Sequence, residues 1–108
     1  MSTFDDRERA FESMYAKDEE LKFRVIARRN RLLGHWAARL MGLSEAEADA
    51  YAKEVVRADF EEAGDEDVIR KLLGDLTAHG ANIDESEIRR AVDNKFIDAR
   101  RQIMESGS

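Results

Sequence analysis

Residues 83–88 read IDESEI, and this stretch holds the clearest helix-start signal in the chain. Asp84 and Glu87 have the spacing of a capping box, in which each side chain accepts a hydrogen bond from the backbone amide of the other residue. Ile83 and Ile88 flank the box as a hydrophobic staple, which fixes the angle at which the chain enters the helix. The stretch therefore predicts the start of a long helix that runs towards the C-terminus.

Three further helices are predicted upstream of this one. Gly42 ends a first run of helically spaced apolar residues, because glycine tolerates the left-handed turn at a helix end. Ser44 and Glu47 form a second capping box, and Asp65 is a suitable N-cap for a third helix. The four expected helices cover residues 21–41, 45–62, 66–79 and 85–104.

Each expected helix has one apolar face. The residues expected to face inward are Leu21, Val25, Leu32, Trp36, Leu40, Ala48, Tyr51, Ala52, Val55, Val56, Phe60, Val68, Ile69, Leu72, Leu73, Leu76, Ile88, Ala91, Val92, Phe96, Ala99 and Ile103. Because the connections are short, neighbouring helices should be antiparallel. The chain has 108 residues, no proline and 43% apolar residues, enough for one modest core. We therefore expect an all-α protein that forms a compact four-helix bundle.

The composition argues against several classes of function. The chain has no cysteine, so thiolate catalysis and thiolate metal binding are ruled out. His35 and His79 lie on different predicted helices without a histidine at metal-ligand spacing, and no phosphate-binding glycine motif is present. We expect no enzymatic activity, no catalytic residue and no metal site. The net charge of -6 disfavours nucleic-acid binding.

No segment is predicted to enter a membrane. No apolar run approaches the ~20 residues that cross a bilayer. The N-terminus carries acidic residues where a secretion signal needs basic ones. We expect a soluble, intracellular protein.

The N-terminal segment differs from the rest of the chain. Phe4, Phe11 and Tyr15 lie on one narrow stripe of an otherwise charged helix. Three consecutive acidic residues then interrupt the apolar face, and an isolated helix of this length is marginal in water. We therefore divide the chain into an N-terminal arm, residues 1–20, which should be mobile or partly helical in the free protein, and a bundle of residues 21–108.

Charges are segregated along the sequence. Residues 21–42 include six basic residues and no acidic one. Turning their helix at 100° per residue places five side chains on one outward face. These residues, called the basic ridge below, are Arg24, Arg28, Arg31, His35 and Arg39. The ridge is a solvated face, a complement to the acidic segments, or a site for an anion such as a nucleotide phosphate.

Two further charged features stand out. Residues 59–67, DFEEAGDED, contain six carboxylates and predict either a solvated turn with capping residues or a surface that faces a partner. Arg29 and Asp59 fall within the apolar faces of their helices, so two opposite charges should point inward. We expect an Arg29 to Asp59 contact that fixes the register of the first two helices.

Three stretches of the chain resemble a known family. They are TFDDRERAFE (residues 3–12), ARRNRLLGHWAA (residues 27–38) and YAKEVVRADFEEAGDEDV (residues 51–68). They are similar to the zeta-subunit family of alphaproteobacterial F-type ATP synthase inhibitors. The resemblance covers roughly residues 1–75. Beyond that point only the helical pattern and the capped start at Asp84 agree.

The resemblance implies a regulatory role at the ATP synthase. In this family a mobile arm becomes helical as it enters a catalytic interface of the ATPase headpiece, where it blocks ATP hydrolysis. By this resemblance, the part of the arm that enters the interface extends to Lys17. The partner-binding residues of the arm, carried over by position, are Thr3, Phe4, Asp5, Asp6, Arg7, Glu8, Arg9, Ala10, Phe11, Glu12, Met14 and Tyr15.

The resemblance also implies the partners and the location. The partner is the headpiece with its alpha, beta and gamma subunits, and the protein is expected in the cytoplasm, associated with the membrane-bound enzyme. The free protein is expected to be a monomer. No cofactor is implied, apart from ATP or ADP as a weak regulatory ligand.

Two alternative functions remain open from the sequence. The protein could be a helical adaptor that binds a partner through its bundle, for example through the acidic run of residues 59–67. It could also be a nucleotide-sensing protein that uses the basic ridge.

Overall fold

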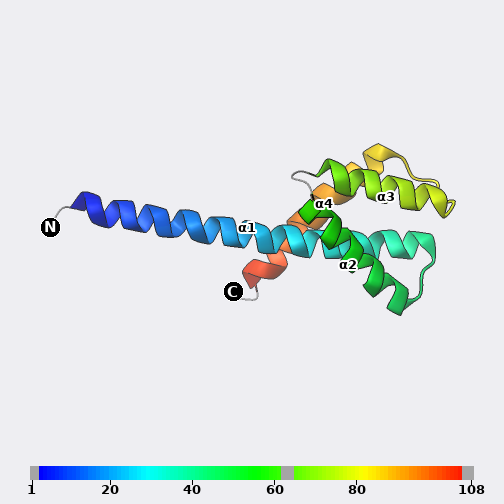
Figure 1. The fold of residues 1–108 in the computed structure, drawn as a ribbon, viewed down its shortest axis with the longest axis horizontal. Helices are drawn as coiled ribbons and strands as arrows, with labels where there is room; N and C mark the ends of the chain where they lie inside the picture. Colours follow the sequence, from blue (N-terminus) through cyan, green and yellow to red (C-terminus); the bar gives the residue numbers. More distant parts are fainter. Residues whose placement is uncertain (1–2, 62–64, 106–108) are drawn as a thin grey trace.

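The computed structural model describes the backbone of residues 3–61 and 65–105, and the side chains of residues 19–58 and 65–105. The helices are α1 (Thr3–Met41), α2 (Glu45–Glu61), α3 (Glu66–Ala78) and α4 (Glu85–Glu105), as Figure 1 shows. The described residues contain no strand. The expected all-α four-helix bundle is therefore confirmed.

Helix α1 begins earlier than the first bundle helix expected at residue 21. Its backbone is helical from Thr3, because no glycine or proline precedes Gly34 and exposed charges such as Glu19 and Glu20 do not interrupt a helix. In Figure 1 the N-terminal end of α1 projects beyond the other three helices. The side chains of residues 3–18 lie outside the described residues, so the mobility of the arm in the free protein stays a prediction.

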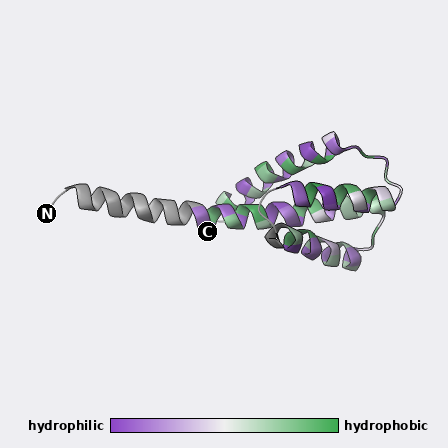
Figure 2. Cartoon of the chain, turned by 45° about the horizontal axis from the view of Figure 1, so that its top comes forward, coloured by the Kyte–Doolittle hydropathy of each residue, from purple (hydrophilic) through white to green (hydrophobic). Residues whose placement is uncertain are grey.

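Helix α1 is the centre of the bundle. It packs against α2, α3 and α4, while α3 also packs against α2 and α4. Within the described residues α2 and α4 do not contact each other, so they lie on opposite sides of the α1 and α3 pair. In the coloured parts of Figure 2, apolar residues occur on all four helices, as expected when each helix contributes one face to a shared core.

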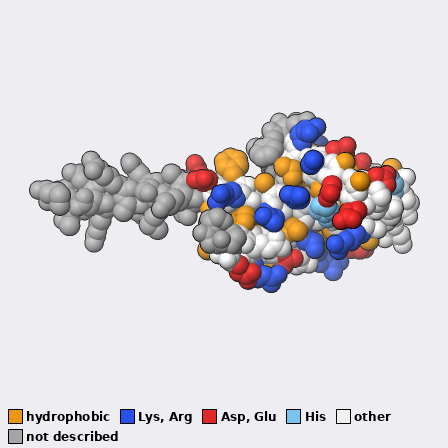
Figure 3. All heavy atoms as spheres, turned by 90° about the horizontal axis from the view of Figure 1, so that it is seen from below, with side chains coloured by type: hydrophobic (Ala, Val, Ile, Leu, Met, Phe, Trp, Pro, Cys, Tyr) orange, Lys and Arg blue, Asp and Glu red, His pale blue; other side chains and the backbone are white. Residues whose placement is uncertain are grey.

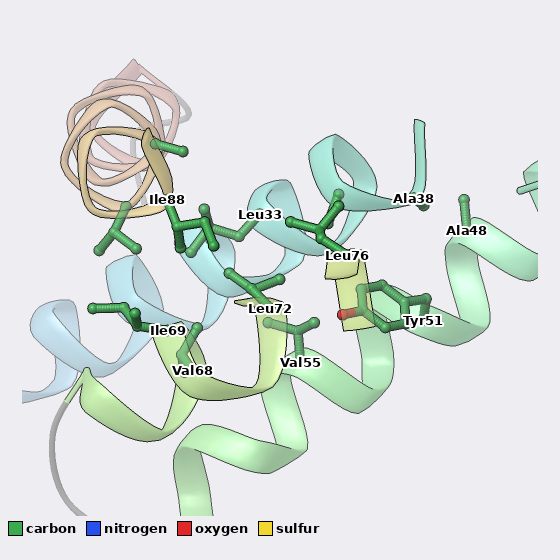
Figure 4. Close-up of a cluster of buried hydrophobic side chains, with 13 residues drawn as sticks. Leu33, Ala38, Ala48, Tyr51, Val55, Val68, Ile69, Leu72, Leu76 and Ile88 are labelled. Atoms are coloured by element: carbon green, nitrogen blue, oxygen red, sulfur yellow. The ribbon is translucent and has the colours of Figure 1, made fainter. Parts of the chain in front are cut away.

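The core consists of two clusters. The larger one joins all four helices around Leu33, Val55, Leu72, Leu76 and Ile88, and Figure 4 shows these side chains pointing towards one another. The smaller one joins α1 to the C-terminal part of α4. Its buried residues are Val25, Ala99 and Ile103, with Leu21, Leu32 and Phe96 packed against them. The C-terminal part of α4 therefore lies beside the point where α1 enters the bundle.

The buried face of α1 differs in part from the predicted one. Leu40 was expected to face inward, but 47% of its surface is exposed. Leu33, Ala37 and Ala38 are fully buried instead. The physical reason is the close contact between α1 and α2 at Gly34, because small residues let two helix backbones approach and turn this side of α1 towards the core.

The helix ends confirm much of the predicted capping. Ser44 and Glu47 form the full box: the Ser44 amide donates to Glu47 Oε1 at 3.0 Å, and the Glu47 amide donates to Ser44 Oγ at 3.2 Å. The hydrogen bond from the Ser44 amide lowers the pKa of the Glu47 carboxyl. At α4 the Glu87 amide donates to Asp84 Oδ1 at 2.8 Å, and the Ser86 hydroxyl adds a second hydrogen bond to the same oxygen.

Two glycines end helices in the left-handed conformation. Gly42 has φ 74° after α1, and Gly80 has φ 77° after α3. His79 is the C-cap residue of α3, and its Nδ1 lies 2.9 Å from the carbonyl oxygen of Asp75. The end of α1 was predicted from Gly42, and α3 ends within one residue of the expected position.

Candidate functional site

The basic ridge lies on the side of α1 that faces away from the core. Arg24 and Arg31 lie on roughly the opposite side of the helix axis from the buried Leu33. The four ridge arginines are exposed, whereas His35 is half-buried. Figure 3, viewed from the side opposite α3, shows basic side chains spread along this face, with a histidine and acidic side chains among them. The structure therefore confirms that the ridge is an outward face.

The flanking helices touch the ridge at two places. His35 Nε2 lies 3.4 Å from Asp49 Oδ1 of α2, which forms an ion pair when the imidazole is protonated. Arg28 Nη1 donates to Gln102 Oε1 of α4 at 3.4 Å. The sequence pattern singled out neither Asp49 nor Gln102, because both contacts join different helices, whose relative packing periodicity alone does not give.

The other ridge arginines have no such partner. Within the described residues, the side chains of Arg24, Arg31 and Arg39 form neither an ion pair nor a hydrogen bond. The bundle therefore does not neutralise this face, and the idea that the ridge mainly complements the protein's own acidic segments is not supported by those residues.

Arg29 is the centre of a buried polar network on the inner side of α1. Only 3% of its surface is exposed. Its Nε and Nη2 donate to Oδ1 of the buried Asn30 at 3.1 and 2.8 Å, and its Nη1 donates to Asp65 Oδ1 at 2.9 Å. The inward orientation of Arg29 is confirmed. The side chain of Asp59 lies outside the described residues, so the Arg29 to Asp59 contact stays a prediction.

Asp65 precedes α3, as predicted, but its side chain does not cap the helix. The N-cap residue makes no side-chain capping bond, because its carboxylate accepts from Arg29 instead. This ion pair ties the start of α3 to the middle of α1. The sequence pattern missed this function of Asp65, since the two residues are 36 positions apart.

Residues 65–67, the described end of the acidic run, form ion pairs within the protein. Glu66 binds Arg89 through both carboxylate oxygens at 3.0 and 2.9 Å, and this hydrogen bonding lowers the pKa of the Glu66 carboxyl. Asp67 lies 3.3 Å from Arg70. Together with Asp65, these contacts favour the turn with intramolecular partners over a partner-facing surface for residues 65–67.

A second polar cluster joins α2 to α3. The Tyr51 hydroxyl donates to Asp75 Oδ2 at 2.7 Å, and Lys71 Nζ lies 3.1 Å from the same oxygen and 3.5 Å from Glu54. The Lys71 ammonium also lies 5.2 Å from the centre of the Tyr51 ring. Burial, with the hydrogen bond to Asp75, raises the pKa of Tyr51. Every charge in this cluster has a partner, so it stabilises the helix pair and offers no open site.

The predicted arm residues, from Thr3 to Tyr15, have side chains outside the described residues, and their binding role stays a prediction. Among the described side chains, no group of three or more His, Asp or Glu residues could hold a metal ion. None of the helices in residues 3–61 and 65–105 combines the length and apolar character needed to cross a bilayer.

The comparisons with known proteins place the chain in a family. A family model described as ATPase inhibitor subunit zeta matches residues 1–102. A protein with a solution NMR structure is 48% identical over 80% of this chain and 98% of its own, with a TM-score of 0.71. The comparison with curated proteins gives no match.

These matches fit the small all-α bundle described above. The chain belongs to the ATPase inhibitor subunit zeta family. Membership supports a regulatory role as an inhibitor of the ATP synthase, and it confirms the family resemblance inferred from residues 3–12, 27–38 and 51–68.

Proposed function

We propose that this protein inhibits ATP hydrolysis by an F-type ATP synthase, and that residues 3–17 enter a catalytic interface of the ATPase headpiece as a helix. The observation that carries the proposal is the family match, which covers residues 1–102 and so includes both arm and bundle. In this proposal the arm makes the inhibitory contact, and the bundle holds the arm at the enzyme.

The packing of α1 supports this division. Leu21 is the first described residue of α1 that packs against the core, and Glu19 and Glu20 before it are exposed. Among the described side chains, the contribution of α1 to the core therefore starts at Leu21, and the core includes residues of all four helices. In this proposal, the segment before Leu21 is the part that binds the partner.

The arm sequence has the features of a helix that docks in a groove. Phe4, Phe11 and Tyr15 share one helical stripe and would be its apolar anchors. The charged residues around them would set the orientation of the helix through ion pairs. Ordering a segment of this length on binding costs several kcal/mol, which the burial of these aromatic side chains must exceed.

Inhibition of hydrolysis without equal inhibition of synthesis would follow from the rotation of the headpiece. Rotation in the hydrolytic direction would close the interface around the arm, whereas rotation in the synthetic direction would open it and release the arm. The bundle would act as a stop, because it is too bulky to follow the arm into the interface.

An ATPase assay with the purified headpiece tests the proposal. The full-length protein should inhibit hydrolysis, and a variant lacking residues 1–17 should not, while its circular dichroism and melting temperature show an intact bundle. Undiminished inhibition by the truncated protein would overturn the proposal. That result would instead favour an adaptor that acts through the bundle.

A further inference from the structure

We propose that the basic ridge of α1, residues Arg24, Arg28, Arg31, His35 and Arg39, docks on a carboxylate-lined protein surface of the ATP synthase headpiece, beside the site that receives the arm. This inference rests on the proposed function. It adds a second contact, made by the bundle, whose role is to steer the protein to the enzyme and orient it there.

The charge of the ridge is available to a partner. No acidic residue occurs in residues 21–42, and among the described side chains the flanking helices provide a carboxylate to the ridge only at His35. Arg24, Arg31 and Arg39 have no side-chain partner within the described residues. A protein with a net charge of -6 thus presents one positive face. Guanidinium groups bind carboxylates through two parallel hydrogen bonds, so an acidic protein surface is the complementary partner.

The ridge is also presented on a rigid support. The opposite side of α1 is buried through Val25, Arg29, Leu33 and Ala37. From Arg24 to Arg39 the helix rises by about 22 Å at 1.5 Å per residue. A row of this length is long enough to contact an extended surface and longer than a single small anion requires.

The position of the ridge next to the arm identifies the surface it would meet. Arg24 follows Lys17, the last residue of the segment proposed to enter the interface, by only seven residues. Even a fully extended chain spans at most about 25 Å over that distance. Whatever protein holds the arm must therefore lie close to the N-terminal end of the ridge. Charge pairs at the edge of an interface mainly raise the association rate and fix the orientation.

Association kinetics with the purified headpiece test this inference. The test variant is the full-length chain with Arg24→Glu and Arg31→Glu, and the control carries Arg57→Glu and Arg90→Glu. Both control arginines are exposed and form no ion pair among the described residues. The two double variants change the net charge equally, and melting temperatures establish that both are folded.

At low ionic strength the ridge variant should associate on the order of tenfold more slowly than the wild type, and the control should change by less than about twofold. Added salt should lower the association rate of the wild type and reduce the difference in rate between the wild type and the ridge variant. Equal rates for the two variants would overturn the inference. So would nucleotide-dependent NMR shifts confined to the ridge with unchanged association, because the ridge would then be a nucleotide site.

The full-length Phe11→Ala variant separates this inference from the proposed function. If it inhibits as well as the wild type, the role of the arm is refuted while the kinetic comparison of the ridge remains valid. If it loses inhibition and the ridge variant still associates at the control rate, the proposed function stands and the docking role of the ridge is refuted.

Discussion

Gly34 of α1 packs directly against the backbone of Ala52 in α2. A Cβ atom on Gly34 would lie 2.4 Å from Cα of Ala52 and 3.0 Å from its Cβ. Real Cβ atoms do not approach a backbone atom this closely, so any larger residue at position 34 must push α1 and α2 apart.

Gly34→Ala should therefore destabilise the protein although alanine favours helices. We expect the free energy of unfolding to fall by about 1–3 kcal/mol, as in overpacked cores. Gly74→Ala is the matched control, because it lies within α3 with no neighbouring atom within 4 Å of an added Cβ. That variant should gain about 0.5–1 kcal/mol. Urea unfolding measures both values, and a stabilised Gly34→Ala variant would contradict the close contact.

Arg29→Lys should be costly even though it keeps the positive charge. A lysine ammonium cannot reproduce the fork that binds both Asn30 and Asp65, so the buried Asn30 oxygen loses its donors. We expect a loss of about 1–3 kcal/mol in urea unfolding. Asp65→Asn should cost under about 1 kcal/mol, because that side chain is 53% exposed and an amide oxygen still accepts from Arg29. Similar losses for both variants would argue against this network.

Tyr51 should make the stability of the protein sensitive to alkaline pH. Its pKa is raised in the folded protein, so the unfolded chain ionises first, near pH 10. The contribution of Tyr51 to the free energy of unfolding is therefore fully present below pH 10 and is lost as the pH rises above that value. Tyr51→Phe removes the dependence and the hydrogen bond to Asp75, at a cost of about 0.5–1.5 kcal/mol at neutral pH. Urea unfolding of the wild type and the Tyr51→Phe variant between pH 8 and 11 measures this dependence. If the free energy of unfolding fell equally with pH in both proteins, Tyr51 would not be its cause.

Phe11→Ala and Trp36→Ala should have opposite effects. Phe11→Ala should weaken inhibition of the headpiece by more than about tenfold, since losing an aromatic anchor at an interface costs about 2–4 kcal/mol. Its melting temperature should stay close to that of the wild type. Trp36 packs against the larger core cluster while half-buried, so Trp36→Ala should lose about 3 kcal/mol of stability. If both variants lost the same property, the division into arm and bundle would be wrong.

Local signals in the sequence were sufficient for the turns between the helices, although not for the start of α1, which begins at Thr3. The box at Ser44 and Glu47 forms as predicted, and Gly42 and Gly80 end their helices. These features depend on residues a few positions apart, where backbone geometry alone decides the partners. The outward position of the basic ridge was predicted for the same reason, because helical periodicity fixes which side chains share a face.

Contacts between distant segments could not be predicted in the same way. Apolar periodicity placed Leu40 inside, because hydropathy gives little weight to small residues such as Gly34 that allow close helix contacts. Asp65 was expected to cap α3, but capping preferences do not reveal that the Arg29 guanidinium lies within 2.9 Å. The role of Asn30 was not predicted, since its side-chain oxygen becomes an acceptor only because the neighbouring Arg29 is buried.

The antiparallel course of α4 beside α1 has a practical consequence for attaching probes. Ile103 packs near Leu21, so a fluorophore or affinity tag joined at the C-terminal end of α4 is carried to the root of the arm. There it would report on docking, or obstruct it if bulky. The turn between α3 and α4 lies at the other end of the bundle (Figure 1), which makes it the safer place to immobilise the protein on a surface.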